Sequence, residues 1–340
     1  MCTLGKKFSM SFLVVLLVLA LSGCKDTAAS ADTETSLSDA ETVLLDTETV
    51  LSDSDTEEIL LDTEETFSDT EEALSDDTEE TLSDIEDSSV AVPFRFVDAL
   101  GEWHETSILP EVQKHPYNWT YLKNDSSGIS YNDSHYTIRK GIDVSYHQGT
   151  IDWEKVKAEG YDFAIIRIGY RGYGSSGVVK LDTSFHENIK NAQKAGFDVG
   201  VYFFAQAINE QEAIEEAEFV LDALEGYELQ LPVVYDPELI RDAVARTDNV
   251  SGEQFTKNTI VFCNMIKEAG FEPMIYSNMI WEAFLFDMTQ LQEYPFWYAD
   301  YETIPQTPYD FVMWQYSEKG RVNGIDGVVD LNVWFCPTNP

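Results

Sequence analysis

From residue 138 onward, short apolar runs alternate with longer segments that begin and end as helices do. The apolar runs are too short for buried helices and suit strands that are covered on both faces. Strands that alternate with helices indicate a parallel sheet, and eight strands indicate that the sheet closes into a barrel. The expected strands are residues 141–145, 163–168, 199–205, 232–235, 273–276, 296–299, 311–316 and 328–333.

Four of the intervening segments have helix start signals. An Asp, Asn or Ser stands before each segment, and three of the segments stop at a glycine. The last three strands follow each other with little room for helices. We therefore expect one α/β domain, an irregular barrel of eight strands with fewer helices. The expected capping residues are Asp152, Asp182, Asn209 and Ser251, and the glycines are Gly160, Gly196 and Gly270.

The first 23 residues are typical of an export signal. Lys6 and Lys7 precede an apolar run over residues 10–21, which is shorter than the about 20 residues of a membrane span. The run ends in Leu-Ser-Gly-Cys, which resembles the lipobox of bacterial lipoproteins. That resemblance implies removal of residues 1–23, a lipid on Cys24, and anchorage to the cell membrane on the side facing the wall. An ordinary cleaved signal followed by an incidental cysteine is the alternative.

Residues 24–89 differ in composition from everything that follows. About two dozen acidic residues face a single lysine here, so the segment holds more than half of the net charge of −41. Such a segment repels itself and has too little apolar surface to fold, so we expect a disordered tether. Leucines recur about every seven residues, but a coiled coil needs two apolar positions per heptad and flanking charges of both signs. The acidity argues against a nucleic acid as partner.

Residues 90–137 contain aromatic residues and turn signals without a periodic pattern. We expect an N-terminal extension that packs on the main domain, and a small separate module is the alternative. The barrel is then residues 138–340, and about 200 residues suit a single domain.

Acidic residues gather where the expected strands end, and the most informative pair is Asp236 and Glu238. They end the run Leu-Pro-Val-Val-Tyr, and side chains at i and i+2 of a strand point to the same face. Asp143, Asp300 and Asp330 lie at the ends of other strands. Hydrolysis of a glycosidic bond needs two carboxyl groups, one to protonate the leaving oxygen and one to support the cationic centre. Aromatic side chains near these strand ends suit stacking on sugar rings.

Seven segments in combination resemble the lysozymes of glycoside hydrolase family 25: GIDVSYHQGTIDW, AIIRIGYRGYG, DVGVYFFAQA, LPVVYDPE, PMIYSN, WYADY and FVMWQYSEKGRVNGIDGVVDLN. They span residues 139–335 and leave out the tether and the extension. The resemblance implies an irregular β/α barrel that hydrolyses, with retention, the β-1,4 bond between N-acetylmuramic acid and N-acetylglucosamine. Peptidoglycan glycan strands are then the partner, and wall remodelling or turnover is the role. We expect a monomer without a cofactor, and the five histidines show no metal spacing.

The resemblance also implies roles for individual residues. Glu238 is the general acid and later the base. Asp236 either attacks the anomeric carbon or orients the 2-acetamido group of the substrate, which attacks in its place, and we favour the second route. Asp143 and Asp330 position Asp236 and the substrate. The residues expected to bind the sugar are Tyr202, Tyr235, Tyr276, Trp297, Asp300 and Gln315.

Other interpretations of these residues stay open. Asp143 and Asp330 also suit turns, Arg167 suits a paired charge inside the barrel, and the aromatic residues suit a core. For the whole protein, the alternatives are a catalytically silent glycan-binding module and a glycosidase for another N-acetylated polymer such as chitin. Cys263 and Cys336 are expected to be thiols rather than a disulfide.

Overall fold

The computed structural model describes residues 92–125, 128–241 and 243–338. The predicted export signal, the predicted lipid attachment at Cys24 and the predicted acidic tether lie outside these residues. Within the described part of the chain, no helix combines the length and the apolar character that crossing a bilayer requires.

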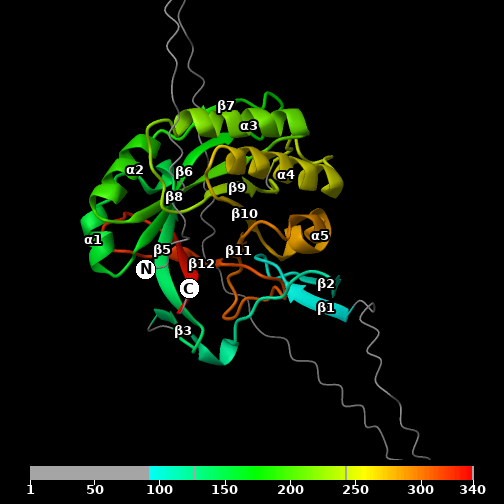
Figure 1. Ribbon diagram of the computed structural model, residues 1–340, viewed down its shortest axis with the longest axis horizontal. Coiled ribbons are helices and arrows are strands. Elements are labelled where there is room, and N and C mark those ends of the chain that lie inside the picture. The colour runs from blue at the N-terminus through cyan, green and yellow to red at the C-terminus, as the bar shows by residue number, and fades with distance from the viewer. Residues whose placement is uncertain (1–91, 126–127, 242, 339–340) are drawn as a thin grey trace, which may run out of the picture. The chain divides into compact units, whose positions relative to one another are not determined.

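A closed barrel of eight strands forms the centre of the described chain (Figure 1). The strands follow the order β5-β13-β12-β11-β10-β9-β8-β6, and pairing of β5 with β6 closes the ring. Neighbours are parallel except for β13, which is antiparallel to both β12 and β5. A short strand, β7 (Val179–Leu181), pairs with β6. The barrel strands are β5 (Tyr136–Val144), β6 (Phe163–Arg171), β8 (Asp198–Ala205), β9 (Val233–Pro237), β10 (Pro273–Ser277), β11 (Phe296–Ala299), β12 (Met313–Gly320) and β13 (Val329–Pro337).

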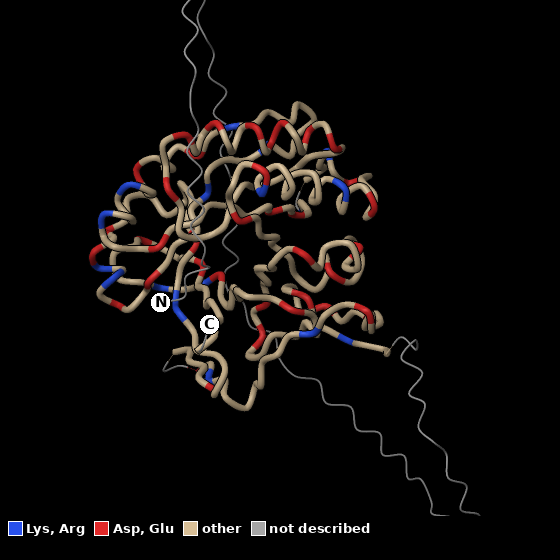
Figure 2. The backbone as a smooth tube through the Cα atoms, in the orientation of Figure 1, with Lys and Arg blue, Asp and Glu red and all other residues tan. Residues whose placement is uncertain are grey.

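The structure confirms the predicted fold, an irregular barrel of eight strands with few helices. Four longer helices connect the first five barrel strands and lie outside the barrel (Figure 1). Three of these helices carry both acidic and basic residues, whereas the third in chain order, residues 210–223, carries acidic residues only (Figure 2). The helices are α1 (Trp153–Ala158), α2 (Phe185–Lys194), α3 (Glu210–Ala223) and α4 (Gly252–Glu268).

Helix capping follows the sequence with one exception. In α1, α3 and α4 the side chain of the expected capping residue accepts a hydrogen bond from the first turn. Helix α2 begins after Ser184, whose side chain makes no such bond. The prediction that Asp182 caps this helix is wrong. Its carboxylate instead accepts from the N–H of Ser184 at 2.9 Å and pairs with Arg167 on the barrel.

The second half of the barrel has only short helical pieces. A π-helical turn (Trp281–Leu285) and α5 (Met288–Leu291) lie between β10 and β11. In the described chain, loops connect β11 to β12 and β12 to β13. This agrees with the short spacing of the last three strands in the sequence.

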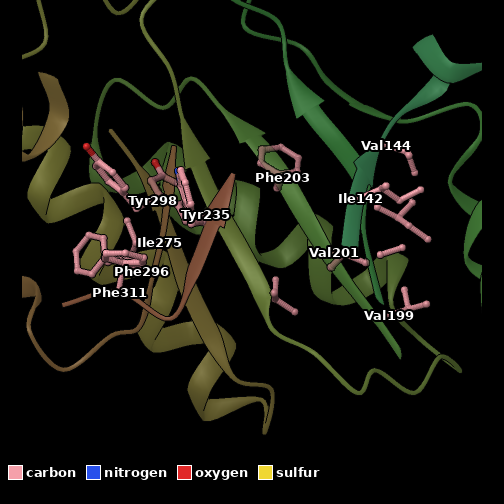
Figure 3. Packing of buried hydrophobic residues seen from close by; sticks show 14 of the residues in the cluster. Ile142, Val144, Val199, Val201, Phe203, Tyr235, Ile275, Phe296, Tyr298 and Phe311 are labelled. Carbon is pink, nitrogen blue, oxygen red and sulfur yellow. The ribbon is translucent and has the colours of Figure 1, made fainter. Parts of the chain in front are cut away.

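Strand side chains alternate between two apolar layers. Residues such as Ile142 and Phe203 point outward and pack between strands and helices (Figure 3), whereas Trp297 belongs to the layer inside the barrel. Cys263 belongs to the outer layer and Cys336 to the inner one, and no disulfide joins them. Burying one large apolar side chain contributes about 1.5–3 kcal/mol. A one-residue slip would exchange the layers, so these contacts fix the register of each strand.

The segment before the barrel packs against it. Two hairpins, β1 (Val92–Val97) with β2 (Trp103–Ile108) and β3 (Leu122–Asp125) with β4 (Gly128–Tyr131), flank a loop that contains Tyr117. The ring of Tyr117 stacks on Phe335 of β13 with centroids 4.1 Å apart, and its hydroxyl donates to the carbonyl oxygen of Phe311 at 2.6 Å. Buried residues of this segment join the outer apolar layer of the barrel.

Candidate active site

Four acidic residues lie at one end of the barrel. Asp236 and Pro237 are the last two residues of β9, and Glu238 is the next residue in the chain. Asp143 lies near the C-terminal end of β5, and Asp330 near the start of β13 is its cross-strand partner. Parallel strands bring their C-terminal ends to one end of the barrel, and the antiparallel β13 brings its beginning to the same end. Each of the four residues acts electrostatically on at least one of the others.

The carboxyl groups of Asp143 and Asp330 interact directly. Asp143 is buried and accepts from Nδ2 of Asn332 at 2.8 Å and from Nε2 of Gln315 at 2.9 Å. Burial raises the pKa of Asp143 to about 6 in spite of these hydrogen bonds. Burial, together with the charge of Asp143, raises the pKa of Asp330 to about 9. At neutral pH the pair therefore holds one proton, on Asp330, which donates to a negatively charged Asp143.

Asp236 and Glu238 differ in their access to water. Asp236 is 3% exposed, and its Oδ1 has no hydrogen-bond partner among the described residues. Burial raises the pKa of Asp236 well above its usual range, and Glu238 and Asp143 add to the rise. Burial also raises the pKa of Glu238 to about 7, with a further contribution from Asp143. Glu238 as a residue is nevertheless exposed, so solvent and substrate can reach it.

Arg167 brings a positive charge to these carboxyl groups. Its Nε forms an ion pair of 2.8 Å with the buried Asp182, and its guanidinium lies against the rings of two tyrosines. Its charge opposes the rise in the pKa of both Asp236 and Glu238. Arg167 is therefore a paired charge, and its field also reaches the site.

A family model decides what kind of barrel this is. The model described as "Glycosyl hydrolases family 25" matches residues 142–325. This span is more than half of the 340 residues and includes Asp143, Asp236 and Glu238. The chain belongs to this family.

Relatives of this family 25 protein include two lysozymes and a solved structure. The autolytic lysozyme of Clostridium acetobutylicum is 26% identical over 194 residues, which are 57% of this chain and 55% of that protein. Lysozyme M1 of Streptomyces globisporus is 30% identical over 203 residues, 57% of this chain and 66% of that protein. The structure of a family 25 glycosyl hydrolase from Bacillus anthracis is similar with a TM-score of 0.50 at 25% identity, covering 64% of this chain and 94% of that one. This chain thus spans just over half the length of the autolytic lysozyme.

Three residues expected to bind sugar form a hydrogen-bonded network inside the family 25 barrel. The hydroxyl of Tyr276 donates to Oε1 of Gln315 at 2.9 Å, and Gln315 in turn donates to Asp143. Nε1 of Trp297 donates to Oδ1 of Asn332 at 2.8 Å, and Asn332 also donates to Asp143. All of these side chains are buried. The polar groups of the network are directed at one another and at Asp143, so they orient this carboxylate.

Tyr202 and Tyr235 lie on opposite sides of the barrel wall. Tyr202 is half-buried and packs against the inner layer, with its ring centroid 6.1 Å from that of Trp297. Tyr235 points outward, and its ring packs on Phe262 of α4 with centroids 4.7 Å apart (Figure 3). Because Asp236 faces the inside, its neighbour Tyr235 must face outward. This corrects the expectation that Tyr235 binds the sugar.

Asp300 directly follows β11. Its carboxylate accepts from the hydroxyl of Tyr298 at 2.8 Å and from the N–H groups of Glu302 and Gln306 at 3.0 and 2.9 Å. These bonds shape the loop after β11, and sugar binding by Asp300 stays a prediction.

Sequence reasoning did not single out Asn332 and Tyr301. Asn332 follows Asp330 at i+2, so the alternation of strand side chains places both on the same face. Tyr301 donates its hydroxyl to Gln315 at 3.0 Å from a loop, where no periodic signal marks it.

Asp98, Glu102 and His104 form a cluster of potential metal ligands in the described chain. One oxygen of Asp98 accepts from the N–H groups of Leu100 and Glu102, and the other faces His104 and Arg241 at 3.2 and 3.6 Å. This arrangement fits the cap of the β1–β2 hairpin.

Proposed function

We propose that this family 25 protein is a muramidase that hydrolyses the β-1,4 bond from N-acetylmuramic acid to N-acetylglucosamine in peptidoglycan. The proposal depends on one observation, the group of Asp143, Asp236, Glu238 and Asp330, in which Glu238 contacts water with a pKa of about 7. A carboxyl group that is protonated near neutral pH suits a general acid. The lysozyme names of two relatives support this activity, and family membership points to peptidoglycan as the polymer.

In the proposed reaction, Glu238 donates its proton to the glycosidic oxygen while the bond to the anomeric carbon breaks. The oxygen of the 2-acetamido group of N-acetylmuramic acid attacks this carbon, and Asp236 accepts a hydrogen bond from the acetamido N–H. Glu238, now ionised, takes a proton from the water that opens the cyclic intermediate. Two displacements at the same carbon retain its configuration. Direct attack by Asp236 is the alternative route and has the same stereochemical outcome.

The reaction requires the proton on Glu238 and a negative charge on Asp236. In the free protein the pKa of both groups is raised, so the two titrate as a pair. The unpartnered Oδ1 of Asp236 offers a place for the acetamido N–H of the substrate. A hydrogen bond to the ionised form lowers a carboxyl pKa. Substrate binding would therefore favour a charged Asp236 and leave the proton on Glu238.

Asp143 and Asp330 contribute charge and orientation to this mechanism. Asp143, ionised by the hydrogen bonds it accepts, stabilises the positive charge that develops at the anomeric centre. Asp330 stays protonated, and its hydroxyl donates a hydrogen bond to the carboxylate of Asp143. A fixed charge of this kind needs no reorganisation during the reaction.

We further propose that the enzyme works outside the cytoplasm as a monomer attached to the membrane through lipid on Cys24. The Leu-Ser-Gly-Cys sequence supports the lipid, and the acidic composition of residues 24–89 supports a tether. Two or more acyl chains anchor a protein stably. The tether would keep the barrel at a high effective concentration near the wall.

Product analysis tests the proposed activity. The full chain is incubated with purified peptidoglycan, and the products are reduced and separated. We expect muropeptides that end in muramitol. Glu238→Gln keeps the side-chain shape without the acid, and we expect about 10²–10⁴ times less product from it. Reduced ends of glucosamine, or products from chitin oligomers alone, would contradict a muramidase, and no products from either polymer would favour a silent glycan-binding module.

A further inference from the structure

The main-chain carbonyl of Glu238 is held by a buried side chain from the neighbouring strand. Gln206 directly follows β8 and is 1% exposed, and its Nε2 donates to the carbonyl oxygen of Glu238 at 2.7 Å. Because a carbonyl oxygen only accepts, the amide nitrogen of Gln206 must be the atom that faces it. Oε1 of Gln206 accepts from the hydroxyl of Thr247 at 3.0 Å, which agrees with this orientation.

This bond restrains Glu238 where strand pairing no longer does. Strand β9 ends at Pro237, which pairs with Ala205 of β8. Among the hydrogen bonds of the described residues, Glu238 is held through its main chain and not through its carboxyl group. The peptide planes on either side of a residue set the direction of its side chain. Pro237 has a fixed φ angle, and the bond from Gln206 fixes the plane that follows Glu238.

Gln206 is itself held on every side. Its N–H donates to Oε1 of Glu216 at 3.2 Å, and its carbonyl oxygen accepts from Nη1 of Arg246 at 2.9 Å. Glu216 pairs with Arg171 at 2.8 Å, and Arg246 makes two bonds of 2.6 Å with a glutamate of α3. All four polar groups of Gln206 are thus engaged. A side chain that is locked by its neighbours can hold a catalytic group in place.

We propose that Gln206 is a positioning residue, which holds the main chain of Glu238 so that the carboxyl group reaches the leaving oxygen. This inference rests on the proposed function, because it requires Glu238 to be the acid. A displacement of about 1 Å at a catalytic group costs on the order of 100-fold in rate. Gln206 is too buried to contact the substrate, so its loss should lower kcat and leave KM nearly unchanged.

The test compares two substrates with the full chain and its Gln206→Met variant, which keeps the side-chain length and removes the donor. On peptidoglycan fragments we expect kcat to fall by about 10- to 100-fold. The second substrate is N-acetylglucosaminyl-N-acetylmuramic acid carrying a dinitrophenyl group at the anomeric carbon. Its leaving group departs as a stable phenolate and needs no proton from Glu238. For this substrate we expect kcat/KM to fall by less than about threefold, since acid catalysis is no longer required.

Asn258→Leu is the matched control. Asn258 is also fully buried, and its Nδ2 donates to the carbonyl oxygen of Ala207, the residue after Gln206, at 2.9 Å. Neither hydrogen bond of its side chain in the described structure involves Glu238, so this variant should lose thermal stability as Gln206→Met does while its kcat stays within about twofold of the wild type. If Gln206→Met does not fold, Thr247→Val takes its place. It removes the hydroxyl that orients the amide, and we expect a smaller loss that is again confined to peptidoglycan.

Two outcomes overturn the inference. One is an equal loss of Gln206→Met on both substrates, which would mark a general structural role. The other is a wild-type kcat of the variant on peptidoglycan. If the wild type cleaves neither peptidoglycan nor the dinitrophenyl glycoside, the proposed function itself is wrong. This result is distinct from a loss of activity that appears only in Gln206→Met.

Discussion

Two groups of acidic residues lie on the two sides of strands β8 and β9, and they differ in their partners. At the barrel mouth, four carboxyl groups face one another, and Arg167 is already paired with Asp182. On the outer side, each glutamate of the second group contacts an arginine within 4.0 Å. The first group is Asp143, Asp236, Glu238 and Asp330, and the second is Glu212 and Glu216 with Arg171 and Arg246.

The difference separates charges that stabilise the fold from charges kept for chemistry. Buried carboxylates normally need a partner, because the loss of hydration is costly. The outer group meets this need with bidentate and charge-assisted bonds. At the mouth, no ion pair with these four carboxyl groups is found among the described residues, and the pKa values of Asp330, Asp236 and Glu238 are raised. Burial also raises the pKa of Glu216 to about 7, but there the charge and the hydrogen bond of Arg171 oppose the rise. A raised pKa without an ion-pair partner suits a group that transfers protons.

The largest effect is expected from breaking the outer group. Arg171→Met leaves Glu216 buried without its cation, and we expect unfolding by denaturant to require about 3–5 kcal/mol less free energy. The double variant Arg171→Met, Glu216→Leu replaces both partners and should recover much of this loss. A loss below about 1 kcal/mol in the single variant would show that Glu216 is not held as a paired charge.

The second effect concerns the protons at the mouth. Because the pKa of Glu238 is about 7, the active protonated form declines at higher pH. We expect kcat/KM on peptidoglycan fragments to fall about tenfold per pH unit above this value. The dinitrophenyl substrate provides the control, since it needs no acid and should lack this alkaline limb. A flat profile on peptidoglycan up to pH 9 would argue that Glu238 is not the acid.

The smallest effect is a pH dependence of stability. The folded pKa of Asp330, about 9, lies above its ordinary value of 3.8, so the native state binds more protons than the unfolded state between these values. The contribution of Asp330 to stability is therefore complete below about pH 4 and is lost as the pH rises through about 9. Asp330→Asn keeps a donor for Asp143 without titrating.

Thermal unfolding of the wild type and of Asp330→Asn across this range measures the effect. The wild type should lose stability more steeply with rising pH, with a difference in slope below about 1.4 kcal/mol per pH unit, the limit for one proton. Parallel curves for the two proteins would show that Asp330 does not keep its proton in the folded state.

The fold could be predicted where it depends on neighbours in the chain. Apolar runs, capping residues and glycines predicted all eight barrel strands and the four longer helices, because these signals act within a few residues. The alternation of strand side chains predicted that Asp236 and Glu238 lie close together, and the effect of Glu238 on the pKa of Asp236 agrees with this. The same rule places Tyr235 outward, against its expected contact with the sugar.

Contacts between distant residues left no local signal. Gln206 and Glu238 are 32 positions apart, and the bond between them depends on the pairing of β8 with β9. The stacking of Tyr117 on Phe335 likewise joins a non-periodic loop to the last strand. Asp182 is a residue type that often caps helices. Only the position of Arg167 on β6 shows that Asp182 belongs to an ion pair. Such contacts follow from the closed barrel rather than from any short segment.

The antiparallel direction of β13 has a consequence for when the candidate site is complete. This strand closes the barrel between β5 and β12, and it also brings Asp330 beside Asp143. Under the export that we propose, a chain that crosses the membrane N-terminus first has an open sheet until Val329–Pro337 arrives. Closure of the barrel and completion of the carboxyl group set are then one event. A chain still in transit would lack the finished site that the proposed hydrolysis of the wall requires.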